Sequence, residues 1–195
     1  MSYVIGLIIS YFLGSIPMGL LLTKFMGRGD LRKVGSGNIG ATKDMRVGGL
    51  RMAGLVWILD MAKAAAAGFL GKYIAGDAFG AWCGFAAIVG HCFPVWLKFR
   101  GGKGISSLFG VLLSVSPMSF AGCGIEWLVV ALTSGISSLG AVIVFCLIPV
   151  LGFAISVQVG WAFLAIGLLC MWRHRENIGR LIKGVESKIE WKWMK

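Results

Sequence analysis

Residues 105–172 form an almost uninterrupted apolar stretch, and this stretch restricts the chain to folds that are surrounded by lipid. Its only charged residue is Glu126. One membrane-spanning helix needs about 20 apolar residues, so the stretch has room for several. Over the whole chain, 57% of residues are hydrophobic and 14% are charged. Since so few charged side chains could not cover a water-exposed surface, the sequence predicts an all-α, polytopic integral membrane protein.

Three shorter apolar segments precede this stretch. We expect them to cross the membrane over residues 2–23, 50–71 and 79–97. The first contains a break between Gly14 and Pro17, and it has neither the basic start nor the cleavage site of a signal peptide, so we expect it to be retained. Polar or glycine-containing breaks divide the later stretch near Ser116-Pro117, Thr133–Ser138 and Gly152–Ser156.

Basic residues predict the orientation. Residues 24–51, 98–104 and 173–195 hold 17 of the 19 lysines and arginines. Cytoplasmic loops retain such residues, so all three segments should face the cytoplasm. An even number of spans must then join the second segment to the third, and four spans use the whole apolar stretch. The sequence predicts one domain, residues 1–195, with about seven transmembrane helices, the N-terminus outside and the C-terminus in the cytoplasm. Five transmembrane helices is the alternative. With seven helices, the loop Thr133–Ser138 also faces the cytoplasm.

The first basic segment contains GSGNIGATK at residues 35–43. This matches the GxGxxG pattern of dinucleotide-binding folds, but an apolar span precedes it where those folds have a strand. A Walker A loop is also excluded, because Ala41 stands where that motif has lysine. A glycine-rich loop can still turn backbone N–H groups toward an anion, and polar side chains are denser here than in a plain connector. The candidate anion-binding residues are Gly35, Ser36, Gly37, Asn38, Gly40, Ala41, Thr42 and Arg46.

The second basic segment reads KFRGGKG at residues 98–104. Glycines at the start of the fourth helix would direct free N–H groups and the positive end of the helix dipole toward a bound anion. Lys103 would add a full positive charge. A loop that only carries cytoplasmic charge is the alternative for so short a motif. The candidates here are Gly101, Gly102, Lys103 and Gly104.

The third basic segment, residues 173–195, predicts an amphipathic helix at the membrane interface. At about 100° per residue, one helix face carries His174, Asn177, Ile178, Leu181 and Val185. The other face carries Arg175, Glu176, Arg180, Lys183 and Glu186. A membrane anchor explains the apolar residues of the first face but not its histidine and asparagine. We therefore expect His174 and Asn177 to point into the helix bundle.

Other ionisable residues lie inside the predicted spans. Asp60 and Lys63, three residues apart, predict a buried ion pair that positions helices. His91 is expected to pack between helices through a hydrogen bond, and Glu126 has no predicted role. The five cysteines contain no CxxC pair and are expected to be small buried side chains. With only two histidines in the chain, neither a metal nor a cofactor is predicted.

Three stretches resemble the signature regions of the bacterial acyl-phosphate-dependent glycerol-3-phosphate acyltransferases: GSGNIGATK, GHCFPVWLKFRGGKGI and RHRENIGRLIKGVESK. The segment ILDMAK resembles the Asp-x-x-Lys of that family's second span. The resemblance covers the whole chain and implies a multi-pass enzyme of the bacterial inner membrane. It implies transfer of a fatty acyl group from a long-chain acyl phosphate to the 1-hydroxyl of glycerol 3-phosphate. Lysophosphatidic acid and inorganic phosphate would be the products, in the first step of phospholipid synthesis.

The resemblance and the chemistry of the side chains together suggest roles for most of the candidate residues. The acyl phosphate would be held by backbone N–H groups of residues 40–42 and 101–104, with Thr42 and Lys103. Glycerol 3-phosphate would be held by Ser36, Arg46, Lys103, His174 and Asn177, with Ser137 as a weaker candidate. The predicted catalytic residues are His174, Lys103 and Ser36. The hydroxyl proton would pass to His174 or to the substrate's own phosphate, and the resemblance favours the phosphate. Positioning and charge stabilisation can drive this transfer, because an acyl phosphate is already activated.

Other functional classes fit the sequence less well. The HxxxxD box of acyl-CoA-dependent acyltransferases is absent, since Trp96 and Gly179 stand five residues after the two histidines. A transporter of a phosphorylated metabolite is the alternative function, but its polar residues would gather near the bilayer midplane. A lipid-binding scaffold would leave the glycine-rich loops unexplained. The formal net charge of +11 lies in loops between spans and indicates membrane lipids and phosphates, not nucleic acid, as partners. We expect a monomer.

Overall fold

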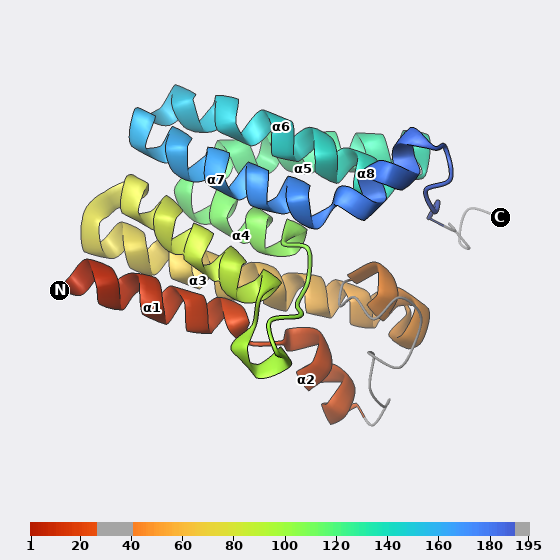
Figure 1. The fold of residues 1–195 in the computed structure, drawn as a ribbon, viewed down its shortest axis with the longest axis horizontal. Coiled ribbons are helices and arrows are strands. Elements are labelled where there is room, and N and C mark those ends of the chain that lie inside the picture. The colour runs from red at the N-terminus through yellow and green to blue at the C-terminus, as the bar shows by residue number, and fades with distance from the viewer. Residues whose placement is uncertain (27–40, 190–195) are drawn as a thin grey trace. The chain divides into compact units, whose positions relative to one another are not determined.

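The computed structural model describes residues 1–26 and 41–189, with side chains from residue 49 onward in the second range. All regular structure in these ranges is helical. The chain divides into two compact units, Met1–Val115 and Ser116–Lys195. Figure 1 labels the helices of both units.

The first apolar segment is a helix broken in the middle. Helix α1 (Ser2–Ser15) and helix α2 (Met18–Phe25) meet at a bend of 42°. Proline lacks a backbone N–H and disfavours helical geometry in the residue before it, so Ile16 is extended ahead of Pro17, with ψ 118°. The break that the sequence predicts between Gly14 and Pro17 is confirmed.

Helix α3 (Ala41–Cys92) contains the next two apolar segments. Its backbone leaves helical geometry at Gly49, at φ 76°, and again at Ala75 and Gly76, where Gly76 has φ 79°. The chain reverses direction at this second point, as the turn at the end of the α3 hairpin shows (Figure 1). The resulting helices, residues 50–74 and 77–92, match the predicted segments 50–71 and 79–97 except at the last boundary. Pro94 ends the second helix early, and a 3-10 turn (Val95–Leu97) follows.

Small residues bring α1 and α3 close together. A Cβ atom on Gly14 would lie 1.9 Å from the carbonyl oxygen of Ala87, and one on Gly90 would lie 2.1 Å from that of Tyr11. Glycine at such contacts allows helix backbones to approach, and this packing replaces the hydrophobic drive that lipid does not supply. Helix α4 (Ile105–Val115) also packs against α3 and is the most buried helix of this unit.

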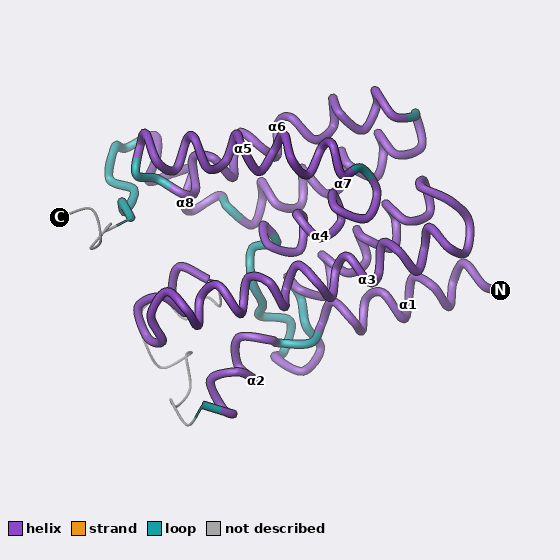
Figure 2. Tube along the Cα trace, turned by 180° about the vertical axis from the view of Figure 1, so that it is seen from behind, coloured by secondary structure: helices purple, strands orange, loops and turns teal. Residues whose placement is uncertain are grey.

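The second unit consists of three long antiparallel helices and a short one. Helices α5 (Pro117–Ser134), α6 (Ser137–Ile155) and α7 (Val157–Arg173) follow one another, and α6 contacts both neighbours (Figure 2). The three predicted breaks are confirmed. The side chains of Ser116 and Ser156 accept N–H bonds that start α5 and α7, and Gly135, at φ 73°, ends α5.

The outward faces of the described helices are apolar. Three helical segments are long and apolar enough to cross a bilayer, and the bent α1–α2 pair makes a fourth. Helices α4 and α7 are apolar but shorter. Tyr73, Met118 and Val150 are 91%, 86% and 68% exposed, a pattern that suits a lipid environment. Cys146 is likewise exposed, contrary to the expectation that every cysteine is buried, because α6 turns this residue outward.

The end of the chain departs from the predicted interfacial helix. Helix α8 (Arg175–Ile182) stops at Ile182, because Gly184 adopts φ 69° and reverses the chain. The N–H groups of Gly184 and Val185 donate to the carbonyls of Leu181 and Arg180, which is the Schellman arrangement that closes a helix. Val185 is therefore 64% exposed, and not on the buried face. Glu186, expected on the exposed face, has a side chain only 4% exposed.

Candidate functional site

The loop that carries Lys103 is tied back onto the end of α3. The N–H groups of Gly101 and Gly102 donate to the carbonyls of Cys92 and His91, at 3.1 Å each. This corrects the expectation that both glycines present free N–H groups to an anion. The turn between these ends contains Lys98 and Phe99 at φ 52° and 60°, which is strained geometry for residues other than glycine.

The paired glycines of this loop are explained by close packing. A Cβ atom on Gly101 would lie 2.1 Å from the carbonyl oxygen of His91, and one on Gly102 would lie 2.1 Å from Nε2 of the same histidine. No side chain fits at either position without displacing His91. The glycines thus let the loop cross directly over this ring.

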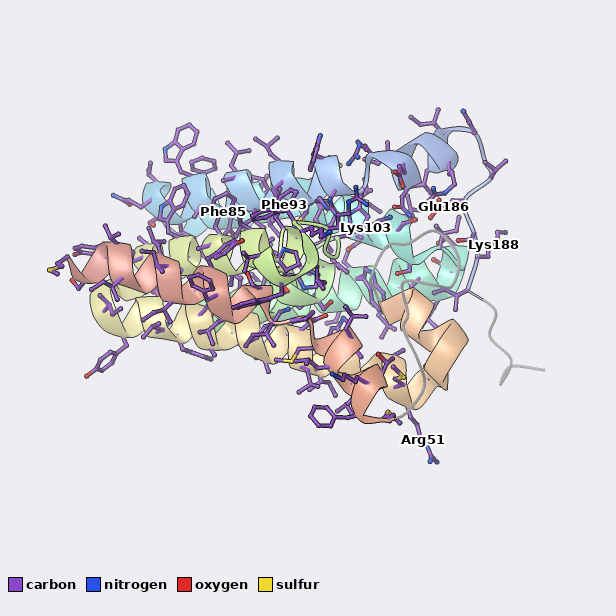
Figure 3. All side chains as sticks on the ribbon, turned by 60° about the horizontal axis from the view of Figure 1, so that its bottom comes forward. Arg51, Phe85, Phe93, Lys103, Glu186 and Lys188 are labelled. Carbon is purple, nitrogen blue, oxygen red and sulfur yellow. The ribbon has the colours of Figure 1, made fainter. Side chains whose placement is uncertain are left out.

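The loop joins α4 next to Lys103. Gly104 adopts φ 92°, and its carbonyl accepts the N–H of Leu108, so α4 starts at Ile105. The first N–H groups of a helix have no partner inside that helix and point out of its N-terminus. Lys103 directly precedes this end, which is a favourable place for a phosphate (Figure 3).

Beneath the loop lies the predicted ion pair. Lys63 Nζ is 2.7 Å from Asp60 Oδ1, and both side chains are buried. The expected pair is confirmed, and it has a third member, since His91 Nδ1 is 3.5 Å from the same carboxylate oxygen. The sequence indicates the pair but not its contact with His91.

The glycine-rich candidates of the first basic segment are only partly described. Gly35, Ser36, Gly37, Asn38 and Gly40 lie outside the described residues, as do the side chains of Ala41, Thr42 and Arg46. Helix α3 begins at Ala41, so the backbone N–H groups of residues 41 and 42 belong to a helical first turn. A helix N-terminus thus follows the GSGNIG motif as one follows the GGKG motif.

His174 lies at the junction of α7 and α8 and is 4% exposed, as predicted for a side chain that points inward. Its Nδ1 is 2.9 Å from the carbonyl oxygen of Cys170, and its ring lies 4.9 Å from that of Phe145. A carbonyl oxygen can only accept a hydrogen bond, so Nδ1 carries the proton. The neutral ring then has its basic lone pair on Nε2.

Asn177 is 9% exposed and held by Glu186. Its Nδ2 donates to Glu186 Oε1 at 2.6 Å, and the Ser138 hydroxyl donates to the same oxygen at 2.9 Å. Arg180 Nε donates to Oε2 at 2.6 Å. Because a carboxylate only accepts, the amide of Asn177 must turn its nitrogen toward Glu186 and its oxygen the other way. Figure 3 shows Glu186 beside the end of α8.

These contacts determine the charge state of Glu186. Burial raises the pKa of this carboxyl, but the hydrogen bonds from Arg180, Asn177 and Ser138 and the Arg180 charge outweigh it, so the pKa lies below its ordinary value. The carboxylate is therefore ionised at neutral pH and keeps all three donors.

The sequence did not indicate two of the residues that are hydrogen-bonded together around Asn177, namely Ser138 and Glu186. The sequence prediction named Ser137, but the carbonyl of Ser137 accepts a hydrogen bond from Trp127 Nε1 at 3.2 Å. The hydroxyl that donates to Glu186 belongs to the next residue, Ser138. The sequence prediction also put Glu186 on the wrong face. Gly184, two residues before Glu186, is the signal that could have indicated a chain reversal. The tail does return to the loop Thr133–Ser138, since the Ile189 N–H donates to the carbonyl of Gly135 at 2.7 Å.

Known proteins resemble this chain over nearly its whole length. The family model described as glycerol-3-phosphate acyltransferase matches residues 4–184. A glycerol-3-phosphate acyltransferase of Rhizobium etli (strain ATCC 51251 / DSM 11541 / JCM 21823 / NBRC 15573 / CFN 42) is 44% identical over 183 residues, which is 93% of this chain and 89% of the relative. One of Agrobacterium fabrum (strain C58 / ATCC 33970) is 41% identical over the same shares.

Two solved structures have the same fold. One is the crystal structure of PlsY (YgiH), an integral membrane glycerol 3-phosphate acyltransferase, in its glycerol 3-phosphate form, with TM-score 0.91 and 34% identity. The other is its lysophosphatidic acid form, with TM-score 0.89 and 31% identity. Each alignment covers 97% of this chain and 96% of the solved one. The chain belongs to the glycerol-3-phosphate acyltransferase family.

Proposed function

We propose that this protein transfers a fatty acyl group from a long-chain acyl phosphate to the 1-hydroxyl of glycerol 3-phosphate. The products are lysophosphatidic acid and inorganic phosphate, and the reaction opens phospholipid synthesis. The observation that carries the proposal is the position of Lys103, immediately before the N-terminus of α4, in a chain of this family. The two related structures are a glycerol 3-phosphate form and a lysophosphatidic acid form, which correspond to an acceptor and its acylated product.

The acyl phosphate would bind at the two helix starts that follow glycine-rich motifs. The N–H groups at the start of α4 and at residues 40–42, with Thr42 and Lys103, would bind its phosphate. The acceptor hydroxyl oxygen attacks the acyl carbon, and the bond between that carbon and the phosphate oxygen breaks. Phosphate departs with the electron pair, so Lys103 and the helix dipoles stabilise the charge that develops on it.

Glycerol 3-phosphate would bind to Ser36, Arg46, Lys103, His174 and Asn177, with Ser137 as a weaker contact. Two groups remain candidates for the base that takes the hydroxyl proton. His174 is suited because its Nδ1–H donates to a carbonyl and leaves Nε2 as the basic nitrogen. The substrate's own phosphate is the alternative, because the partner found for Nδ1 is a neutral carbonyl and not a carboxylate that would strengthen the base.

The membrane arrangement is part of the proposal. We infer one acyltransferase domain over residues 1–195, and the family model supports this by matching residues of both compact units. We infer seven crossings, made by the α1–α2 pair, the two helices of α3, and α4 to α7 among the described residues, of which α4 and α7 are shorter apolar helices. From the basic segments we infer that the N-terminus lies outside and that the C-terminus and the active site lie at the cytoplasmic face. We further propose that the protein is a monomer in the bacterial inner membrane.

The test is turnover by purified protein in detergent. Phosphate release is followed with glycerol 3-phosphate and palmitoyl phosphate, and palmitoyl-CoA is supplied in a parallel reaction. We expect turnover with acyl phosphate only, and a kcat/KM at least about 100-fold lower for Lys103→Ala, since a misplaced or missing charge at the reacting group has effects of this order. Arg100→Ala is the matched control, because it removes an exposed charge from the same loop.

Two results would contradict the proposal. Wild-type kcat/KM in Lys103→Ala would remove Lys103 from the site. No turnover with either donor, in a folded preparation, would favour the transporter alternative. Uptake of labelled glycerol 3-phosphate into proteoliposomes would then test that alternative directly.

A further inference from the structure

Three ionisable side chains meet inside the Met1–Val115 unit, and the reaction described above uses none of them. Asp60 lies between Lys63, at 2.7 Å, and His91, at 3.5 Å. The side chains of Asp60, Lys63 and His91 are 8%, 3% and 9% exposed. Burying charges is costly, and a buried ion pair alone is often no more stable than apolar residues in its place. The cluster therefore calls for a role beyond helix packing.

Each member of the cluster is connected to a different segment. Lys63 Nζ donates to the carbonyl of Ile16, at the break between α1 and α2, at 2.8 Å. The backbone carbonyl of Asp60 accepts from the Ser107 hydroxyl, in the first turn of α4, at 3.4 Å. His91 supports Gly102 twice, through its carbonyl and through the ring that Gly102 crosses.

Two of these connections bracket Lys103. Gly102, directly before it, rests on His91, and Ser107, four residues after it, is bonded to Asp60. The turn on the other side of the glycines is strained at Lys98 and Phe99, and such geometry persists only where the surroundings hold it in place. The loop position thus depends on what lies beneath it.

The cluster is too enclosed to touch a substrate. The cavity beside it, lined by residues that include Ile16, Asp60, Lys63, His91 and Gly102, measures about 20 Å³. That is room for one water molecule and not for a phosphate ester. Any effect of the cluster on the reaction must pass through the segments that it contacts, and the loop is the one that carries Lys103.

We propose that Asp60, Lys63 and His91 are positioning residues that hold Lys103, next to the start of α4, in the geometry needed for catalysis. The proposal rests on the proposed function of Lys103. Asp60 orients the His91 ring through Nδ1, and the ring in turn supports Gly102. Lys63 neutralises Asp60 and connects it to the α1–α2 break. Loss of this support displaces the loop, and a displacement of about 1 Å can lower catalysis by about 100-fold.

The experiment uses the double variant Asp60→Asn/Lys63→Met in the full-length protein. Removing both charges avoids leaving one buried and unpaired, so the fold should survive. We expect a melting temperature close to that of the wild type, with kcat/KM for glycerol 3-phosphate and palmitoyl phosphate lower by about 100-fold. Asp77→Asn/Lys72→Met is the matched control, because this pair on α3 is 45% exposed at both residues and should leave kcat/KM unchanged.

A double-mutant cycle distinguishes positioning from a general structural role. In a Lys103→Ala background, the double variant should lower the residual kcat/KM by less than about 3-fold, because effects that act through one residue are not additive. An undiminished loss in that background, or wild-type activity of the double variant, would overturn the inference. Wild-type activity of Lys103→Ala alone would refute the proposed role of Lys103 and this inference with it.

His91→Ala provides the same test if the double variant does not fold. It leaves the Asp60–Lys63 pair intact and removes only the ring beneath Gly102. We expect a loss of kcat/KM in the wild-type background that largely disappears in the Lys103→Ala background. Equal losses in both backgrounds would show that His91 acts only on general stability.

Discussion

Replacement of Glu186 by glutamine tests whether the end of the chain holds Asn177 in place. In the wild type, the carboxylate accepts from Asn177, Ser138 and Arg180. Glutamine keeps one acceptor oxygen and turns an NH₂ group toward the remaining donors, so at least one hydrogen bond to a charged group is lost. Each such bond contributes about 1.5–3 kcal/mol. The Arg180 side chain is 42% exposed, so its bond is discounted to at most about 1 kcal/mol.

The expected effect is a loss of about 2 kcal/mol in the free energy of unfolding, from one lost hydrogen bond donated by Asn177 or Ser138. For a chain of this length, that lowers Tm by roughly 4–8 °C. Activity should fall as well, with a higher KM for glycerol 3-phosphate, because the freed Asn177 amide can rotate. Thermal unfolding in detergent and steady-state kinetics measure the two effects.

The Tm difference between the wild type and Glu186→Gln depends on pH, because the pKa of Glu186 is lowered in the folded protein. A carboxyl whose pKa is lower in the folded state stabilises the protein above the unfolded pKa of about 4.3, and this contribution disappears as pH falls through the folded value. The Tm difference between wild type and Glu186→Gln should therefore be full at pH 7 and shrink below about pH 4. Glu176→Gln, an exposed change on α8, is the control. Equal Tm and KM in wild type and Glu186→Gln at pH 7 would refute the reasoning.

Three other predictions follow from single positions. Gly102→Ala should lower both Tm and kcat/KM, because the added Cβ atom would lie 2.1 Å from His91 Nε2. Gly179→Ala, where a Cβ atom would meet nothing within 4 Å, should stabilise α8 by about 0.5–1 kcal/mol. Similar Tm changes for the two variants would contradict the packing argument. Glu126→Leu should raise the free energy of unfolding by about 1–3 kcal/mol, because both carboxylate oxygens are buried without a hydrogen-bond partner among the described residues. The measurement is Tm in detergent, and a lower Tm would show that the fold needs this carboxylate. His174→Ala should lower kcat/KM by about 100-fold or more, and an acid limb of the pH–rate profile that persists in this variant would assign the base to the substrate phosphate.

The sequence predicted most of the helices and the breaks between them. Pro17, Ser116, Gly135 and Ser156 act on the backbone within a few residues of themselves, through a missing N–H, a capping hydroxyl or a positive φ. Apolar length predicts insertion into lipid by the same kind of local argument. The end of the third apolar helix before Pro94 was not predicted, because apolar residues continue to residue 97 and proline does not end every helix: Pro149 lies inside α6.

Contacts between distant residues required the tertiary structure. Ser138 and Glu186 are 48 positions apart, and Asp60 and Ser107 are 47 apart. The sequence shows that Asp60 and Lys63 share a helix face, but not that His91 completes their cluster or that Gly102 crosses its ring. It also shows glycines in the GGKG motif without showing that two of their N–H groups are already bonded to α3.

The sequence by itself determined the environment, the helical segments and the family, because hydrophobicity, helix caps and signature motifs are properties of adjacent residues. Only the tertiary structure decided which polar groups hold one another: Glu186 returns to Asn177, and His91 lies beneath the Lys103 loop. Such pairings depend on the close packing of whole helices and on chain reversals at single glycines. A buried polar group is bound by whichever partner that packing brings within hydrogen-bond distance, and this is not encoded in any one segment.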